Sequence, residues 1–350
     1  MTRVAVVGYG MAGRDIHVPL LREAGCEVVA VTTANPDRVA AAERDLPQAE
    51  VLPDLPALLH RADELAVDLV VLGSPSGVHA EQAELVIEAG LPLVVDKPLG
   101  VGAVQALRVV DSARGRVPLS VFQSCRFDPD VATLRRLVHH GVLGAVVRAE
   151  MRWERWQPAR SGRWREVLPA EQGGGVLLDL HTHMVDAVVR LFGPVRSVYA
   201  ELASRSTTAE DEAFLSCRHD SGVVSHLGAS ALAAAPGPRW RVLGTRGSYL
   251  VSGTNGEYGG LAELHDPDDG HCGWHYTGTD RSPVPVESVD PADYYRHVAR
   301  ALEETDVAAA QGAMPVDPSD AVHGLAVLDA ARVAARTGAV EEVLTPGVAP

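Results

Sequence analysis

The sequence has few cysteines and no long hydrophobic run, and these two shortages exclude several classes of protein. Its four cysteines are scattered over 350 residues without a C-x-x-C pair. We therefore interpret them as reduced thiols rather than as a disulfide framework. No apolar stretch approaches the roughly 18 residues of a membrane-spanning helix. Residues 1–3 lead directly into an apolar run, so we expect no signal peptide and a cytoplasmic protein.

Positive charge is also scarce, because the formal net charge is −15 and Lys97 is the sole lysine among 31 basic residues. An acidic protein without a basic patch does not suit nucleic acids or membrane surfaces, so we expect neither as a partner. The acidic balance does not exclude an anionic ligand. Backbone N–H groups at a helix start, helped by a few arginines, can hold a phosphate.

Short apolar runs alternate with helical patterns in the first third of the chain. Parallel strands that are buried on both faces have such nearly continuous runs of valine, leucine and alanine. Strand, helix and strand in this order predict a doubly wound parallel sheet, an α/β fold, over residues 1–123. The predicted strands are 4–7, 28–32, 69–72, 93–95 and 119–122, and the predicted helices are 13–24, 36–45, 79–89 and 101–113.

A different pattern begins after residue 123. Closely spaced strand-like runs, with turn signals between them, predict a largely antiparallel sheet. We therefore expect a second α/β domain over 124–350, with a long loop over 253–282 and a frayed end over 345–350. Its predicted strands are 146–153, 197–202, 213–219, 223–230, 240–243 and 248–251, and its predicted helices are 130–140, 291–304 and 318–337.

A glycine-rich turn follows the first predicted strand. Gly8, Gly10 and Gly13 form the pattern G-x-G-x-x-G, with Met11 and Ala12 between the last two. Gly8 permits a tight turn, Gly10 lets the backbone approach a pyrophosphate, and Gly13 lets the helix pack on the strand. Because the turn lies between a buried strand and a helix, it indicates a Rossmann dinucleotide-binding domain rather than a purely structural turn.

The end of the second predicted strand bears on the choice of dinucleotide. NAD-binding domains place a carboxylate there to accept from the ribose 2′-OH, but this strand ends at Thr32 and Thr33. The two hydroxyls, with Arg38 at the start of the next helix and help from Arg14, suit a 2′-phosphate better. We therefore expect NADP as the cofactor, with NAD as the alternative if Arg38 is only a solvated helix residue.

Lys97 follows the strand at 93–95, at the sheet edge where open α/β folds bind ligands. Unlike arginine, a desolvated lysine can give up a proton near neutral pH. The preceding strand leads into Ser74 and Pro75, which would supply a hydroxyl and a flat apolar face beside a nicotinamide. His79 begins the next helix, where a structural role is as reasonable as cofactor contact.

A glycine run at 173–175 precedes a mostly apolar helical segment with three ionisable groups on one face. Asp179, His183 and Asp186 are spaced i, i+4 and i+7. Buried groups of this kind must be paired or functional. Acid–base catalysis by His183, oriented by Asp179, is our preferred interpretation; a structural hydrogen-bond network is the alternative. A metal site is disfavoured, because His181 and His183 would point about 200° apart on a helix.

Together these segments resemble the Gfo/Idh/MocA family, the glucose–fructose oxidoreductases and inositol dehydrogenases, over nearly the whole chain. The family's E-K-P lysine corresponds to Lys97, and its aspartate and histidine to Asp179 and His183. Asp96 stands where that motif usually has glutamate, and His181 where the family is usually small. The resemblance implies an NAD(P)-dependent dehydrogenase acting on a sugar or cyclitol such as an inositol.

The resemblance further implies a substrate pocket and an oligomer. Arg126, Arg163 and Trp164 would line the pocket with the three catalytic residues, although ordinary packing could also explain them. The exposed face of the antiparallel sheet would pair in a homodimer or homotetramer. Two other functions remain open: an NAD-dependent glycosidase and a non-catalytic dinucleotide sensor. The His- and Cys-containing segment 265–275 lacks zinc-ligand spacing, and we interpret it as a solvated loop.

Overall fold

The computed structural model describes residues 1–159, 161–252 and 270–347. The chain divides into two compact units, which are described separately. The first contains residues 1–123 and 290–322, and the second contains 124–289 and 323–350. Residues 290–322, which the sequence analysis assigned to the second domain, thus belong with the first. The reason is that Tyr294, Tyr295 and Val298 are buried on one side of their helix, and the two tyrosines contact the first unit.

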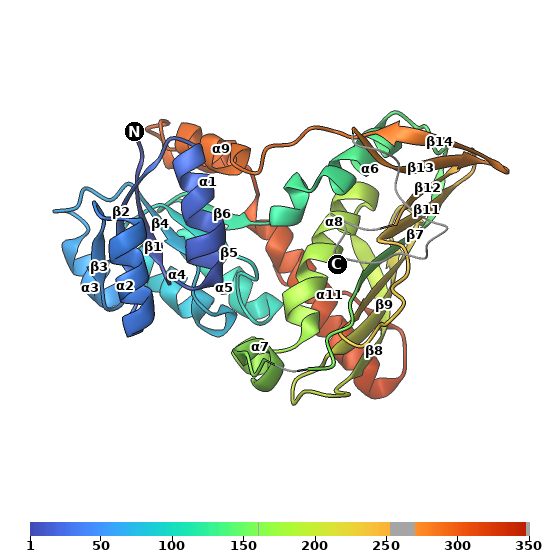
Figure 1. Cartoon of the computed structure of the whole chain (residues 1–350), viewed down its shortest axis with the longest axis horizontal. Helices are drawn as coiled ribbons and strands as arrows, with labels where there is room; N and C mark the ends of the chain where they lie inside the picture. Colours follow the sequence, from blue (N-terminus) through green and yellow to red (C-terminus); the bar gives the residue numbers. More distant parts are fainter. Residues whose placement is uncertain (160, 253–269, 348–350) are drawn as a thin grey trace. The chain divides into compact units, whose positions relative to one another are not determined.

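A six-stranded parallel sheet forms the centre of the first unit (Figure 1). Its order is β3-β2-β1-β4-β5-β6, the doubly wound order in which ligands bind where the strand sequence reverses, between β1 and β4. The apolar runs are almost fully buried, which confirms the predicted fold class of this part. The strands are β1 (Arg3–Val7), β2 (Glu27–Thr32), β3 (Glu50–Leu52), β4 (Leu69–Leu72), β5 (Leu93–Asp96) and β6 (Leu119–Phe122).

Helices connect these strands. The glycine turn leads into a π-helical segment, η1 (Ala12–His17), before α1 (Val18–Glu23) begins. The sequence analysis missed β3, α3 and α10, because three residues are too short for an apolar run and both helices are only seven residues long. The other elements are α2 (Pro36–Asp45), α3 (Leu55–Arg61), η2 (Ser76–Val78), α4 (His79–Glu88), α5 (Ala103–Ala113), α9 (Asp293–Ala301) and α10 (Val307–Ala313).

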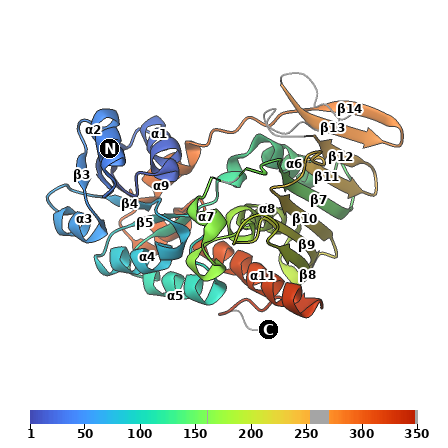
Figure 2. The same ribbon diagram turned by 60° about the horizontal axis from the view of Figure 1, so that its bottom comes forward.

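A nine-stranded sheet forms the second unit (Figure 2). Its order is β14-β13-β12-β11-β7-β10-β9-β8-β15. Only β7 and β10 pair in parallel among its described strands, so the prediction of a largely antiparallel sheet is confirmed. The strands are β7 (Val146–Glu154), β8 (Val195–Ala203), β9 (Glu212–His219), β10 (Val224–Ser230), β11 (Trp240–Gly244), β12 (Ser248–Val251), β13 (His271–Thr277), β14 (Asp280–Pro285) and β15 (Glu341–Glu342).

The predicted loop over 253–282 is wrong in its second half, because β13 and β14 form a hairpin there. Alternating side chains such as those of Cys272, Trp274 and Tyr276 satisfy the strand pattern, but the polar composition concealed it. Residues 253–269, and with them part of the segment considered for zinc, lie outside the described residues, as do 348–350 of the predicted frayed end. In the described part of the chain, no helix is long and apolar enough to cross a membrane.

Helices α6 and α8 lie on one face of this sheet (Figure 2), with α6 against β13 and α8 against β10. The predicted catalytic helix begins as a π-helical segment, η5, and becomes α-helical from Thr182. The helices are η3 (Ser124–Phe127), α6 (Pro129–His139), α7 (Trp164–Val167), η4 (Ala170–Gln172), η5 (Leu177–His181), α8 (Thr182–Phe192) and α11 (Pro318–Thr337), the last of which begins in the first unit.

Candidate active site

The glycine turn lies between β1 and η1 and leaves no room for side chains at two of its three glycines. Gly8 has φ of +94°, and a Cβ there would lie 2.9 Å from the carbonyl oxygen of Gly73. A Cβ on Gly13 would overlap the carbonyl oxygen of Gly8. The Gly8 N–H donates to the Thr32 carbonyl at 3.1 Å. The turn is therefore closed against β2 and β4, as a pyrophosphate cradle at a helix start requires.

The end of β2 carries hydroxyls and a nearby guanidinium but no carboxylate. Thr32 is buried, and its Oγ1 accepts from the Gly8 N–H at 3.2 Å. The Thr33 Oγ1 accepts from the Asn35 N–H at 3.4 Å. The Arg38 guanidinium lies over Gly10, where a Cβ would be 3.6 Å from Nη1. Among the described residues Arg38 has no carboxylate partner.

Arg14, which the sequence analysis considered as a second cation for a 2′-phosphate, is engaged elsewhere. Its Nε donates to the Asp45 carboxylate at 2.8 Å. Tyr9 approaches the same carboxylate, with 3.4 Å between Oη and Oδ2. Arg38 is therefore the better placed of the two arginines for a phosphate on the adenosine ribose.

The loops after β4 and β5 are tied together by His79. This side chain is 1% exposed. Its Nδ1 lies 2.7 Å from the Pro98 carbonyl oxygen, and its Nε2 lies 2.8 Å from the Ser74 carbonyl oxygen. The Ser74 hydroxyl donates to Gln82. Because both ring nitrogens of His79 face backbone oxygens, its contribution here is to hold Pro75 and Lys97 in place rather than to offer a nitrogen to a ligand.

Asp96, the residue before Lys97, is ionised at neutral pH. Burial alone would raise its pKa, but His17 and the positive charge of Lys97 outweigh burial and lower the pKa to about 2. Its Oδ1 accepts from the Lys97 backbone N–H at 2.8 Å. The His17 Nε2 is 3.7 Å from Asp96 Oδ2, beyond hydrogen-bonding distance, so we attribute its effect to electrostatics across that gap. The carboxylate therefore fixes the backbone at the lysine.

In the second unit, the three ionisable residues of the glycine-preceded helix have three different surroundings. Asp179, in η5, pairs with Arg165 at 3.1 Å. The His183 ring, in α8, packs beside Trp153 with 5.6 Å between ring centroids. Asp186 is bound through both carboxylate oxygens by Arg126. Of the three, Asp179 is the most exposed and Asp186 is the anchor of the helix.

The bidentate pair changes the interpretation of Arg126, which the sequence analysis placed in the substrate pocket. Arg126 and Asp186 are both nearly buried, with side-chain exposures of 10% and 4%. Planar Arg–carboxylate pairs of this geometry are strong and orienting. The structure therefore gives Arg126 the role of fixing α8 against η3, whereas its contact with substrate stays a prediction.

His181 does not belong to the face formed by Asp179, His183 and Asp186, and it contacts the sheet instead. It is fully buried, and its Nε2 is 3.4 Å from the Leu227 carbonyl oxygen in β10. Burial, opposed only weakly by backbone hydrogen bonds, lowers its pKa to about 4, so the ring is neutral at neutral pH. His181 is thus a packing residue between helix and sheet.

A buried ion pair lies beside Trp153. The Arg239 guanidinium lies 4.4 Å from the Trp153 ring centroid. Arg239 is 5% exposed and pairs with Asp130, which also accepts from the Trp240 indole N–H at 3.0 Å. Sequence reasoning missed this group, because Asp130 comes from α6, Trp153 from β7, Trp240 from the start of β11 and Arg239 from just before it, so they share no local pattern.

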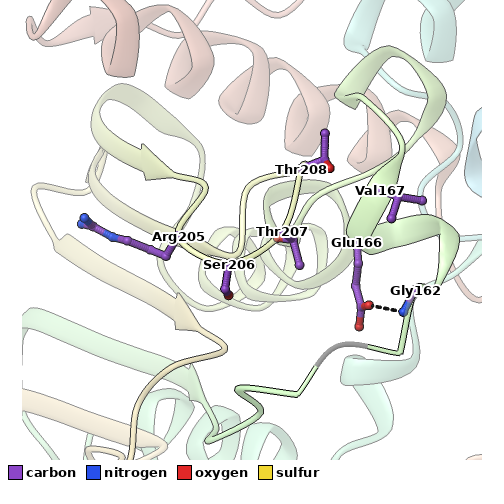
Figure 3. A pocket seen from close by; sticks show the side chains of 7 residues that line it. All are labelled: Gly162, Glu166, Val167, Arg205, Ser206, Thr207 and Thr208. Carbon is purple, nitrogen blue, oxygen red and sulfur yellow. Dashed lines mark hydrogen bonds between the residues drawn. The ribbon is translucent and has the colours of Figure 1, made fainter.

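The segment around α7 contains Arg163 and Trp164, the other two predicted substrate residues. Arg163 precedes α7, and Arg165 stacks over Trp164 at 4.4 Å. Arg165 belongs to the same R-W-R-E run, residues 163–166, which resembles the family and was expected to line the pocket, but its pairing with Asp179 was not predicted. Figure 3 shows the adjoining pocket of about 460 Å³, in which Glu166 accepts from the Gly162 N–H. Arg163 and Trp164 are not among its lining residues.

The sequence analysis disfavoured a metal site on the helix of Asp179, because His181 and His183 are two residues apart. Within the described ranges, no group of three or more histidine, cysteine or acidic side chains is arranged to hold a metal ion. The four cysteines are free thiols, and Cys272 is the only one that is partly exposed.

A doubly wound sheet with a closed glycine turn and a lysine after β5 defines the class of this protein as an NAD(P)-dependent oxidoreductase. Residues 2–121 match the oxidoreductase family with an NAD-binding Rossmann fold, and residues 131–250 match the GFO/IDH/MocA C-terminal domain. The chain therefore belongs to the Gfo/Idh/MocA family, which confirms the resemblance drawn from its motifs.

Relatives of known and unknown activity resemble the chain over most of its length. It is 27% identical to scyllo-inositol 2-dehydrogenase (NADP(+)) IolW of Bacillus subtilis over 94% of this chain and 92% of that one. It is 34% identical to the uncharacterized oxidoreductase YdgJ of Escherichia coli over 72% and 71%. A Klebsiella pneumoniae structure of a candidate oxidoreductase, 29% identical, superposes with a TM-score of 0.82 over 100% and 97%.

Proposed function

We propose that this protein transfers a hydride between NADP and a hydroxyl-bearing carbon of a cyclitol or sugar. The observation that carries the cofactor part is the Arg38 guanidinium over Gly10, beside a β2 end with hydroxyls in place of a carboxylate. The similarity to an NADP-dependent scyllo-inositol dehydrogenase over 94% of the chain supports the substrate class. Shorter matches to two inositol 2-dehydrogenases of Saccharopolyspora erythraea agree with it.

The proposed roles follow from the chemistry of each side chain. Bound nicotinamide supplies the redox chemistry. His183 takes the proton of the substrate hydroxyl during oxidation, and Lys97 stabilises the developing alkoxide with its positive charge. Asp179 orients the substrate from η5, and Arg163 and Trp164 contact its outer part. Gly8, Gly10, Met11, Ala12 and Gly13 would hold the pyrophosphate, with Pro75 beside the nicotinamide.

Replacing Arg38 with alanine should weaken NADP binding about 10- to 100-fold and leave NAD binding within about twofold. A hydrogen bond to a charged group contributes about 1.5–3 kcal/mol, and 1.4 kcal/mol corresponds to a factor of ten. Isothermal titration with each dinucleotide measures both affinities. Arg44→Ala, on the exposed side of the same helix α2, is the matched control. Equal losses for NADP and NAD in Arg38→Ala would mean that Arg38 does not contact the 2′-phosphate.

We further propose that the protein forms a homodimer or homotetramer through one face of its nine-stranded sheet, the face opposite to helices α6 and α8. Phe214 on β9, which packs beside His226 of β10, is 37% exposed on this face. Light scattering should give a mass of two or four times 37.0 kDa. A species at the monomer mass would contradict the proposal.

We also propose that the protein functions in the cytoplasm, as its reduced cysteines suggest.

A further inference from the structure

Two buried side chains of the first unit, His17 and Tyr295, have no part in the function proposed above. Both are fully buried. His17 ends the π-helical segment that follows the glycine turn, and Tyr295 comes from α9, almost 280 residues later in the chain. Figure 1 shows α9 beside α1 at the edge of this unit. The Tyr295 hydroxyl and the His17 Nδ1 are 2.7 Å apart.

The contact with the phenol couples Tyr295 to the tautomer of His17, because one of the two groups must donate the hydrogen bond. Burial, followed by Tyr294 and Asp96, raises the pKa of Tyr295 well above its ordinary value, so the hydroxyl keeps its proton and has it available to donate. A hydroxyl that donates to Nδ1 leaves the imidazole proton on Nε2. Nε2 is buried and has no hydrogen-bond partner within bonding distance in the described part of the chain. It faces Asp96 Oδ2 at 3.7 Å.

The His17 ring is held in this position by its neighbours. The ring of Phe122 packs against it edge-on at 4.9 Å. On another side, a Cβ added to Gly73 would lie 3.2 Å from its Cδ2, so the β4 end closes over the imidazole. Since the ring has little room to turn, its Nε2 stays directed at Asp96. The other oxygen of Asp96 accepts from the Lys97 backbone N–H at 2.8 Å.

We propose that Tyr295 is a positioning residue for Lys97, acting through the His17 tautomer and the Asp96 carboxylate. The C-terminal segment 290–322 thereby completes the lysine site of the dinucleotide-binding unit rather than only packing against it. This inference rests on the proposed function, in which Lys97 acts on the substrate. Tyr295 itself contacts neither substrate nor cofactor in this scheme.

The adjacent Tyr294 provides a matched control. It is equally buried on the same helix, but its hydroxyl donates to the Ser120 Oγ at 2.9 Å. Tyr295→Phe should lower kcat about tenfold, the factor that corresponds to losing one buried hydrogen bond. The dissociation constant of NADPH should stay within about twofold. Tyr294→Phe loses a hydroxyl at similar depth and should keep kcat within about twofold of the unmodified protein.

A second measurement does not depend on activity. Long-range ¹H–¹⁵N NMR of the full chain reports which nitrogen of His17 is protonated. We expect the proton on Nε2 in the unmodified protein and in Tyr294→Phe, and a loss of that preference in Tyr295→Phe. A proton on Nδ1 in the unmodified protein would overturn the proposal, as would equal kcat values for the two variants. If no polyol were turned over at all, the proposed function would fail. The NMR measurement of the His17 tautomer would still test the contact of Tyr295 with His17 and Asp96.

Discussion

Lys97→Met is expected to lower kcat about 10²- to 10³-fold while NADPH still binds with nearly normal affinity. The methionine side chain has a similar length but no charge, so a developing alkoxide loses its cationic partner. Removing one such group from the site of charge development has an effect of about this size. The half-buried Lys97 lies directly after β5, and Asp96 holds its backbone N–H. Stopped-flow or steady-state assays with separate titration of the dinucleotide measure the two quantities.

The control for Lys97 is Lys97→Arg, which keeps the positive charge but does not release a proton near neutral pH. Recovery of tenfold or more over Lys97→Met would assign an electrostatic role to the lysine. Because Lys97 is the sole lysine, an amine-selective reagent that spares the N-terminus modifies this side chain alone. Inactivation by that reagent should slow when NADP is bound. Full activity after stoichiometric labelling would contradict the role given to Lys97.

His183→Gln is expected to lower kcat about 10²- to 10⁴-fold, the contribution of a positioned general base. The His183 ring packs beside Trp153, and the Arg239 guanidinium lies over the Trp153 ring. Glutamine approximates the shape of the imidazole, so the loss should arise from proton transfer rather than from packing. Single-turnover absorbance of the reduced nicotinamide measures the chemical step directly.

His181→Gln is the matched control for this substitution, since it lies two residues earlier and contacts β10. Because His181 is fully buried, its replacement should lower the melting temperature. Its kcat, expressed per folded protein, should stay within about twofold of the unmodified value. If His181→Gln slowed turnover as much as His183→Gln, the effect would come from disturbing the helix, and His183 would lose its assignment as the base.

The parallel sheet could be predicted because its information is local. Apart from β3, each strand of the first unit is a short apolar run buried on both faces, and each is followed by a helical pattern or a turn. The return of 290–322 to this unit could not be predicted in the same way. An amphipathic helix such as α9 shows which of its sides is apolar, but the sequence does not say which surface receives that side.

The candidate site shows a similar division. The glycine turn, the lysine and the Asp179–His183 helix are local motifs, and the sequence analysis found them. Which charged groups pair with one another depends on tertiary contacts. Arg126 with Asp186, Arg165 with Asp179, and Asp130 with Arg239 are separated by between about 14 and 110 residues. For the contact of His17 with Tyr295, the sequence offered one signal, which is a histidine within the otherwise apolar side of the first predicted helix.

The most direct test of the proposed function is absorbance of the reduced nicotinamide, with NAD and NADP each offered alongside a panel of inositols and aldoses. We predict turnover with NADP in preference to NAD and with a cyclitol or a narrow class of sugars. No turnover with any member of the panel, together with tight dinucleotide binding, would contradict the dehydrogenase proposal. That result would favour the glycosidase or sensor alternative instead.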